Sequence, residues 1–326
     1  MKTQLLYVLV SGTEDYYFEQ AFVSAVSARR TNPDARIVLL TDTATDAAIG
    51  ARGPQSGEFR ALFDRIVPVA LDAALPAMKR SRLLKTGMRD YVDGDFLYLD
   101  SDTLVAGPLD GIDAVPGPLA ACADLHCRFA DHPHRAATLS LCRKAGFDAS
   151  GEEVYFNGGV MLARDCPQAK EFFRRWREFY LEGYDRGLHQ DQPALAHANA
   201  SLGHPLQQLP GEWNCQLQYG VRYLGSAKIV HYVCTNVSSG EERKLFVLND
   251  PAVLQKVRSE GPGSVQDVIV DPFRGLASCA RLSTGDDLHF FRTRRYRWLR
   301  SRFRRGRFSF LEFLLKICDH LKITKI

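Results

Sequence analysis

The stretch Phe96–Leu109, which reads FLYLDSDTLVAGPL, decides the expected fold because an apolar run ends in two aspartates and then resumes. The first four residues, FLYL, are typical of a short strand buried on both faces, since such strands carry continuous apolar and aromatic side chains. Asp100 and Asp102 stand where this strand should end. Two carboxylates so close together repel each other and resist burial, so we expect a cation beside them.

Strand-like and helix-like segments alternate on both sides of this stretch. The predicted strands cover residues 5–11, 35–42, 64–71, 96–99, 118–124 and 155–165. Helical spacing of apolar residues predicts helices after residue 15 and over 79–92 and 167–184. Pro68 favours an edge position for its strand. The alternation predicts an α/β fold, with a mainly parallel, Rossmann-like mixed sheet flanked by helices, and a ligand site at the carboxyl ends of the strands.

Composition indicates the class of protein. A chain of 326 residues suits one large α/β domain with an appendage, or two domains. Apolar content of 45% and charged content of 25% are ordinary for a soluble globular protein. The 8 cysteines form no CxxC pair, so we expect reduced thiols in a cytosolic protein. The N-terminal apolar run is too short for a signal peptide, and no stretch of about 18 apolar residues predicts a spanning helix.

Charge is distributed unevenly along the chain. The net charge is +4, but residues 292–326 alone carry nine arginines and three lysines against two acidic residues, which leaves the remainder acidic. Large aromatic and aliphatic side chains are interspersed among these arginines, a pattern typical of helices that lie on anionic membranes. Nucleic-acid binding is the alternative, since arginines with aromatics also suit phosphates and bases. We expect three parts: a catalytic domain at 1–240, an irregular extension at 241–285 and a basic, helical, membrane-associating tail at 286–326.

The spacing of the two aspartates suits a metal ion. Side chains two residues apart on a strand point the same way, so at a strand end Asp100 and Asp102 can both reach one hard divalent cation. Mg²⁺ or Mn²⁺ accepts carboxylates and shares its remaining positions with phosphate oxygens. The alternative is a solvated turn that ends the strand.

Several motifs together resemble a known family. The segment YLDSDTLVAGPL resembles the DxD segment of nucleotide-sugar glycosyltransferases with the GT-A fold, and YFNGGVMLARD and HQDQPAL resemble two segments of glycosyltransferase family 8. With YVLVSG, SRLLKT, LPGEWN and a late histidine, they follow the family's order over roughly residues 4–235. The resemblance implies a GT-A fold, a UDP-sugar donor, a bound Mn²⁺ (or Mg²⁺) and transfer with retention of anomeric configuration.

The resemblance also implies roles for particular residues. The metal ligands would be Asp100, Asp102 and His231, and the alternative for His231 is a core histidine satisfied by a backbone group. The residues that would act in catalysis are Asp191, Gln190 and Asn157. The residues that would bind the donor are Val10, Ser11, Thr13, Arg82, Lys85, Asp100, Ser101, Asp124, Gly158, Gly159 and Gln192. Family members often carry a glycine and a lysine soon after the histidine, whereas Gly240 and Lys244 come late in this chain, so no residue is assigned to grip the diphosphate.

Other interpretations of these residues stay open from the sequence alone. Arg82 suits a bidentate oxygen contact but could be an exposed helix charge, and Asp191 could cap a helix. Asn157 and the two glycines could form a plain turn. The segment DLHCRFADHPH lacks the spacing of a structural zinc site and is expected to be an acceptor-side loop.

We therefore expect a cytoplasmic enzyme, peripherally associated with the inner face of the plasma membrane through residues 292–326. It would transfer a hexose from a UDP-sugar to a cell-surface glycan or lipid-linked oligosaccharide, as in lipopolysaccharide or capsule synthesis, and would bind no nucleic acid. One alternative is a nucleotidyltransferase that makes sugar nucleotides, although VSGTEDYYFE lacks a glycine-rich, basic phosphate loop. Another is a non-catalytic, basic-tailed protein that binds membranes or nucleic acid.

Overall fold

A computed structural model describes residues 1–217, 222–232 and 247–275, together with residues 294 and 298. The chain divides into two compact units, Met1–Cys279 and Ala280–Ile326. The first unit contains every element discussed below. The predicted membrane-associating tail lies outside the described residues, apart from two isolated positions, and stays a prediction. None of the helices in the described part of the chain combines the length and apolar content that crossing a bilayer requires.

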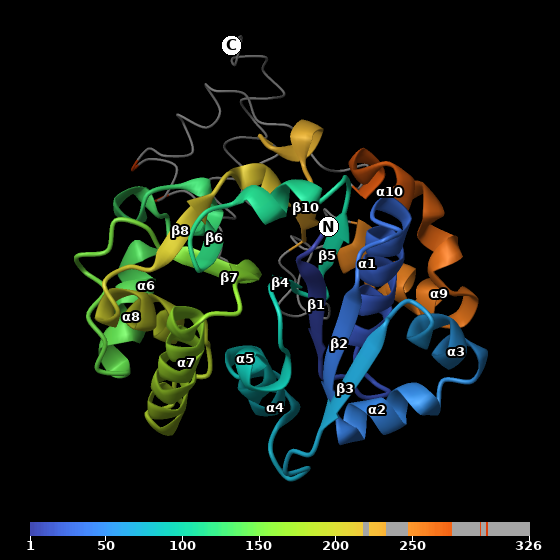
Figure 1. The fold of residues 1–326 in the computed structure, drawn as a ribbon, viewed down its shortest axis with the longest axis horizontal. Helices are drawn as coiled ribbons and strands as arrows, with labels where there is room; N and C mark the ends of the chain where they lie inside the picture. Colours follow the sequence, from blue (N-terminus) through green and yellow to red (C-terminus); the bar gives the residue numbers. More distant parts are fainter. Residues whose placement is uncertain (218–221, 233–246, 276–293, 295–297, 299–326) are drawn as a thin grey trace, which may run out of the picture. The chain divides into compact units, whose positions relative to one another are not determined.

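The first unit is built on a seven-stranded sheet with the order β3-β2-β1-β4-β7-β6-β8 (Figure 1). Its strands are β1 Gln4–Leu9, β2 Ile37–Asp42, β3 Arg65–Val69, β4 Phe96–Leu99, β6 Leu119–Ala123, β7 Phe156–Ala163 and β8 Leu206–Leu209. Strand β7 is antiparallel to both of its neighbours, while the other pairings are parallel. The predicted mainly parallel mixed α/β fold is therefore confirmed.

Helices cover both faces of this sheet, as predicted from the alternation of elements (Figure 1). They are α1 Tyr17–Thr31, α2 Thr43–Gly50, α3 Pro54–Arg60, α4 Ala77–Thr86, α5 Met88–Tyr91, α6 Arg135–Lys144, α7 Pro167–Asp185, α8 Gln192–Ser201, α9 Pro251–Glu260 and α10 Gln266–Val270. Leu97 of β4 belongs to a core cluster with α1, α2 and α3, while Tyr98 belongs to one with α4, α7 and α8. Successive strand residues thus pack on opposite faces.

Two details of the elements test the sequence interpretation. Pro68 lies in the edge strand β3, as predicted, where its missing N–H costs no ladder hydrogen bond. The helix predicted over 79–92 is instead divided at Gly87 into α4 and α5. The periodicity of Leu84, Met88 and Tyr91 continues across the break because both helices face the same core, so the apolar pattern alone could not reveal it.

A second, three-stranded sheet positions the candidate site. Its order is β5-β10-β9, with β5 at Thr103–Val105, β9 at Cys215–Gln216 and β10 at Ile229–His231. Strand β10 runs antiparallel to β5 and pairs His231 with Thr103. This register places His231, a residue from late in the chain, next to the end of the Asp100–Asp102 motif.

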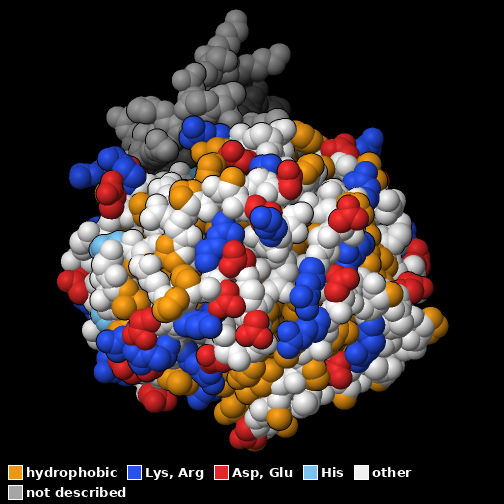
Figure 2. Space-filling model, viewed as in Figure 1, with side chains coloured by type: hydrophobic (Ala, Val, Ile, Leu, Met, Phe, Trp, Pro, Cys, Tyr) orange, Lys and Arg blue, Asp and Glu red, His pale blue; other side chains and the backbone are white. Residues whose placement is uncertain are grey.

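The surface of the described chain mixes both signs of charge. Figure 2 shows lysines and arginines interspersed with aspartates and glutamates over the face in view, with hydrophobic side chains between them. The acidic excess of residues 1–291 is therefore not gathered into one patch on that face.

Candidate active site

Asp100, Asp102 and His231 meet where β4 ends and β10 passes β5. A carboxylate oxygen from each aspartate and a ring nitrogen of His231 all lie within 4.8 Å of one another. His231 Nε2 is 3.2 Å from Asp102 Oδ1, and the backbone N–H of Tyr232 donates to the carbonyl of Asp102 at 3.0 Å. The structure thus brings together the three residues predicted as metal ligands. Both ring nitrogens of His231 face side chains, which differs from the alternative of a histidine satisfied by the backbone.

Gly159 leaves the space that this cluster occupies. It lies inside β7 rather than at the strand's entry, and its carbonyl accepts from the N–H of Asp100 at 2.8 Å. A Cβ added at Gly159 would stand 2.3 Å from His231 Cε1 and 2.8 Å from Asp100 Oδ2. Any larger residue would collide with the imidazole and a carboxylate, so the second glycine of the NGG motif is a requirement of packing. The plain-turn interpretation of this motif is wrong, because Asn157, Gly158 and Gly159 are all strand residues.

Lys85 is the cation that the two aspartates were expected to need. Its Nζ lies 3.0 Å from Asp100 Oδ1 and 3.3 Å from Oδ2, and only 6% of its side chain is exposed. The ammonium also lies 5.0 Å from the ring centre of Tyr98, whose hydroxyl donates to Asp100 Oδ1. Burial, reinforced by the charge of Asp100, raises the pKa of Tyr98 well above its usual value, so the phenol stays a proton donor.

Asp191 stands next to the same cation, at the start of α8. Its side chain makes no capping hydrogen bond, so the N-cap interpretation is wrong. Instead Oδ1 lies 3.0 Å from Arg82 Nε and Oδ2 lies 3.8 Å from Lys85 Nζ. The Asp191 carboxylate raises the pKa of Arg82 above its ordinary value, which excludes neutralisation of the guanidinium. The indole N–H of Trp176 donates to the backbone carbonyl of Asp191 at 3.0 Å and fixes this turn.

The charges of this cluster suit a divalent cation together with an anion. Three carboxylates, those of Asp100, Asp102 and Asp191, face two permanent cations, Arg82 and Lys85. A divalent ion would convert this excess of one negative charge into an excess of one positive charge. Two carboxylates and an imidazole are ligands that Mn²⁺ accepts, and three protein ligands leave positions for oxygens of a phosphate group. The residues present therefore fit the metal that the sequence predicts.

A series of hydrogen-bonded polar side chains extends from His231, away from Asp100 and Asp102. His231 Nδ1 lies 3.0 Å from Asn214 Oδ1, Asn214 Nδ2 lies 3.0 Å from Asn157 Oδ1, and Asn157 Nδ2 lies 2.9 Å from Asp124 Oδ1. His132 Nε2 then contacts Asp124 Oδ2 at 3.0 Å. Within the DLHCRFADHPH segment, His132 is thus a partner of Asp124. Within the described residues, these contacts occupy Asn157 Oδ1 twice and use one N–H of its amide.

The remaining predicted donor residues lie at the edges of this arrangement. Ser11 donates to Asp15 Oδ1 at 2.6 Å, and its N–H donates to Thr45 at 3.0 Å. Val10 is buried at the end of β1, whereas Thr13 is exposed. Gln190 and Gln192 flank Asp191 in sequence, the first exposed and the second partly buried. A Cβ atom added to Gly158 would lie 3.9 Å from Lys85 Nζ. Their roles in donor binding stay predictions.

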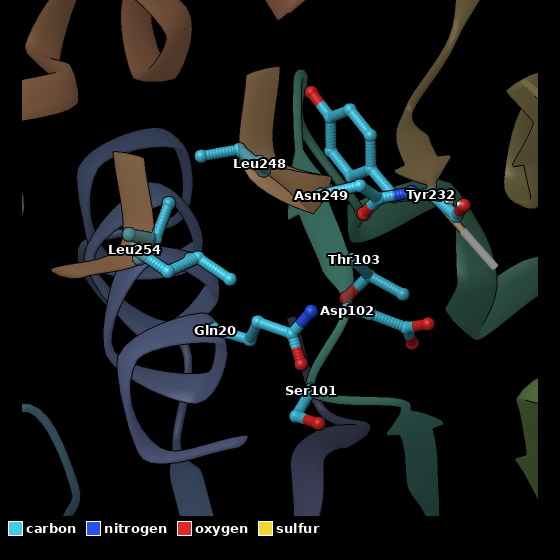
Figure 3. Close-up of a pocket in the computed structure, with 9 residues that line it drawn as sticks. Gln20, Ser101, Asp102, Thr103, Tyr232, Leu248, Asn249 and Leu254 are labelled. Carbon is cyan, nitrogen blue, oxygen red and sulfur yellow. Dashed lines mark hydrogen bonds between the residues drawn. The ribbon is translucent and has the colours of Figure 1, made fainter. Parts of the chain in front are cut away.

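A small, partly open pocket is lined by Asp102 and Ser101 (Figure 3). Gln20 of α1 and Asn249 also line it. Both amide atoms of Gln20 are buried and have no hydrogen-bond partner among the described residues, although the side chain points towards the aspartate motif (Figure 3). The sequence interpretation missed Gln20, Tyr98 and Asn214 as parts of the site. The helical spacing of apolar residues that begins at Tyr17 was the only sequence signal that could have pointed to Gln20. Asn214 gave no signal of a role in the site beyond its position before a strand.

Comparison with known proteins gives a likeness of structure. No protein-family model matches the chain, and no curated protein matches it. Among solved structures it is similar to galactosyltransferase LgtC in complex with donor and acceptor sugar analogs, at 20% identity and a TM-score of 0.48, over 80% of this chain and 96% of that one. It is similar to mouse xyloside xylosyltransferase 1 in its apo form, at 14% identity and a TM-score of 0.47, over 72% and 98%. It is also similar to glycosyltransferase GlyE of Streptococcus pneumoniae TIGR4, at 18% identity and a TM-score of 0.49, over 79% and 64%. Each of these three solved structures is a glycosyltransferase, and the likeness is one of fold.

Proposed function

We propose that this protein is a metal-dependent, retaining glycosyltransferase that moves a hexose from a UDP-sugar to a glycan or glycolipid acceptor. The observation that carries the proposal is the convergence of Asp100, Asp102 and His231 beside a third carboxylate, Asp191, that shares one lysine with Asp100. A metal position and a fixed negative charge next to it are what transfer from a sugar diphosphate requires.

The metal position supports a diphosphate leaving group. Asp100, Asp102 and His231 would hold Mn²⁺ (or Mg²⁺), which when bound neutralises the charge that develops on the departing diphosphate. Gly159 supports this role because its missing Cβ leaves room around the ligand atoms. Lys85 contributes a buried positive charge on the side of Asp100 that faces Asp191.

Asp191 would act on the sugar. Arg82 and Lys85 orient its carboxylate, since both basic groups lie within 4 Å of it. A fixed carboxylate beside the breaking C1–O bond stabilises the positive charge that spreads over C1 and the ring oxygen of an oxocarbenium-like transition state. Asn157 would hydrogen-bond sugar hydroxyls, as would Gln190 and Gln192, which flank Asp191.

The experiment that tests this function compares transfer and hydrolysis of UDP-sugars by the full chain and by three variants, Asp100→Asn, Asp102→Asn and Asp191→Asn. We expect wild-type turnover to require Mn²⁺ or Mg²⁺ and to fall at least about 100-fold in each variant, the size typical of losing a charged catalytic group. Asp90→Asn, an exposed aspartate paired with Arg177, is the matched control and should retain full turnover. Equal turnover by all four variants would contradict the proposal, as would release of diphosphate from a nucleoside triphosphate and a sugar phosphate.

The acceptor and the location in the cell belong to the same proposal. The basic and aromatic residues at 292–326 support association with an anionic membrane, and hence a cytoplasmic enzyme that acts on a membrane-linked surface glycan. Sedimentation with phosphatidylglycerol vesicles should remove the full chain from solution and leave a 1–291 truncation behind. Equal sedimentation of the two proteins would refute the membrane proposal without affecting the transferase assignment.

A further inference from the structure

A continuous chain of hydrogen bonds links His231 to the carboxylate of Asp124 through two asparagines. The heavy-atom distances along it are 3.0 Å from His231 to Asn214, 3.0 Å from Asn214 to Asn157 and 2.9 Å from Asn157 to Asp124. Asn214 is fully buried and Asn157 is 6% exposed. Buried amides are costly unless their partners are correctly placed, so this chain has one strongly favoured arrangement.

The backbone of Gly159 decides which way every hydrogen in the chain points. Its N–H can only donate, and it donates to Asn157 Oδ1 at 3.0 Å. The other end of the Asn157 amide is therefore its NH₂ group, which donates to Asp124. Because Asn157 Oδ1 accepts, Asn214 must present its NH₂ to Asn157 and its carbonyl oxygen to His231.

The direction of the chain fixes the tautomer of the histidine. Asn214 Oδ1 is an acceptor, so His231 carries a proton on Nδ1. When the ring is neutral, its lone pair is then on Nε2, the nitrogen that lies 3.2 Å from Asp102. A histidine that binds a metal generally donates its other N–H to a carboxylate or carbonyl group, which orients the ring and strengthens the lone pair. In this protein two amides extend that contact to a carboxylate.

We propose that Asn214 is a positioning residue, held through Asn157 by Asp124, that directs the Nε2 lone pair of His231 at the metal position between Asp100 and Asp102. This inference rests on the proposed metal site and assigns new roles within it. Asn157 and Asp124 act through Asn214 in addition to any contact with sugar. His132 fits the same arrangement, because its Nδ1 accepts from the N–H of His134 and its Nε2–H therefore donates to Asp124.

The first test measures binding of Mn²⁺ alone to the full chain by calorimetry and by electron paramagnetic resonance. Asn214→Leu keeps the size of the side chain and removes both of its hydrogen bonds, and we expect it to weaken Mn²⁺ binding by about 10- to 100-fold. Asn199→Leu is the matched control, since Asn199 is 2% exposed and also makes two side-chain hydrogen bonds, to His204 and Leu206. It should bind Mn²⁺ as the wild type does. Equal binding by wild type and Asn214→Leu would overturn the positioning role and leave the metal site intact.

A second variant covers the case in which Asn214→Leu does not fold. Asp124→Asn leaves the contact between His231 and Asn214 in place and removes the carboxylate that accepts from Asn157, so it should also weaken Mn²⁺ binding. If this variant binds Mn²⁺ as tightly as wild type, the assigned role of Asp124 is wrong.

A readout without metal separates this inference from the proposed function. Nitrogen-15 spectra of histidine-labelled, metal-free protein distinguish a ring protonated at Nδ1 from one protonated at Nε2. At a pH where His231 is neutral, we expect the Nδ1–H tautomer in wild type and a mixture in Asn214→Leu. The Nε2–H tautomer in wild type would overturn the inference. Failure of wild type to bind Mn²⁺, with the Nδ1–H tautomer present, would instead remove the proposed metal site.

Discussion

Replacement of Gly159 by alanine tests the geometry on which the metal position depends. A methyl group there would lie 2.3 Å from His231 Cε1, 2.8 Å from Asp100 Oδ2 and 2.9 Å from His231 Nδ1. Contacts of this kind normally begin near 3.4 Å, so the imidazole would have to move by about 1 Å. It cannot do so freely, because Asn214 holds Nδ1 and the backbone pairing with Thr103 holds the residue in β10.

The expected loss of stability depends on whether the backbone of Gly159 or the side chain of His231 can move. Strand β7 is buried along its whole length and paired on both sides, so the backbone of Gly159 is held in place. Overpacking of a core by one methyl group generally costs about 1–3 kcal/mol, and loss of the His231–Asn214 hydrogen bond adds about 1 kcal/mol. We expect Gly159→Ala to destabilise the protein by about 2–4 kcal/mol and to weaken Mn²⁺ binding at least about 10-fold, since the ring no longer faces the carboxylates.

Gly158→Ala supplies the control in the adjacent position of the same strand. Its Cβ would meet Leu195 Cδ2 at 3.5 Å and Lys85 at 3.9 Å, which are ordinary van der Waals distances. Urea denaturation and calorimetric titration with Mn²⁺ should therefore separate the two variants, with Gly158→Ala within about 1 kcal/mol of wild type and its Mn²⁺ affinity unchanged. If the two alanine variants lose equal stability and bind Mn²⁺ equally, the close approach of His231 to Gly159 is not a feature of the protein in solution.

Three further predictions use other contacts of the site and its surroundings. Lys85→Met leaves Asp100 and Asp191 without their shared cation and should lower the free energy of unfolding by about 2–3 kcal/mol. This loss is smaller than for a fully buried ion pair because the Asp100 side chain is 25% exposed. Mn²⁺ should raise the melting temperature of this variant more than that of wild type, and an equal rise would contradict the shared-charge interpretation. Gln20→Leu removes two buried amide atoms that have no partner in the described part of the chain, and it should leave thermal stability unchanged or higher. A loss of more than about 1 kcal/mol would show that the amide is hydrogen-bonded in solution. A hydrogen bond from the N–H of Gly94 lowers the pKa of Asp165 from 3.8 to about 2. Wild type should therefore be more stable than Asp165→Asn at neutral pH and should lose that advantage as the pH falls from about 4 to about 2. If the advantage persists undiminished at pH 2, the carboxylate is not its source.

The parts of the fold that could be predicted from sequence are those governed by local patterns. Continuous apolar runs located β1, β2, β4 and β7, because strands buried on both faces have no polar alternation to obscure them. The cation beside the aspartates could also be predicted, since two adjacent carboxylates cannot be buried alone. Its identity could not. Arg82 and Lys85 are three residues apart on α4, where both reach the same side, and only the depth of the helix against β4 decides that the lysine meets Asp100.

Asn214 shows why the rest of the site lay beyond the sequence. An asparagine before a short strand is most often a turn residue, and Trp213 beside it is a buried aromatic. The hydrogen-bond partners of Asn214 lie 57 residues before it and 17 residues after it, and no local pattern encodes such contacts. The same holds for Asp191. Its position at the start of a helix suggested a helix N-cap, but its carboxylate instead contacts Arg82 and Lys85.

The register of β10 is the one non-local choice on which the site depends. Strand β10 has only three residues, and His231 is opposite Thr103 because the N–H of Tyr232 reaches the carbonyl of Asp102. A slip of one residue would turn the imidazole to the other face of the sheet, away from both carboxylates. Two contacts oppose such a slip: Asn214 accepts from the ring on one side, and Tyr232 is buried in a separate core cluster on the other. The alternation of an imidazole facing polar groups with an aromatic ring facing apolar ones therefore sets the register, and the register in turn brings His231, the third proposed ligand, to the aspartates.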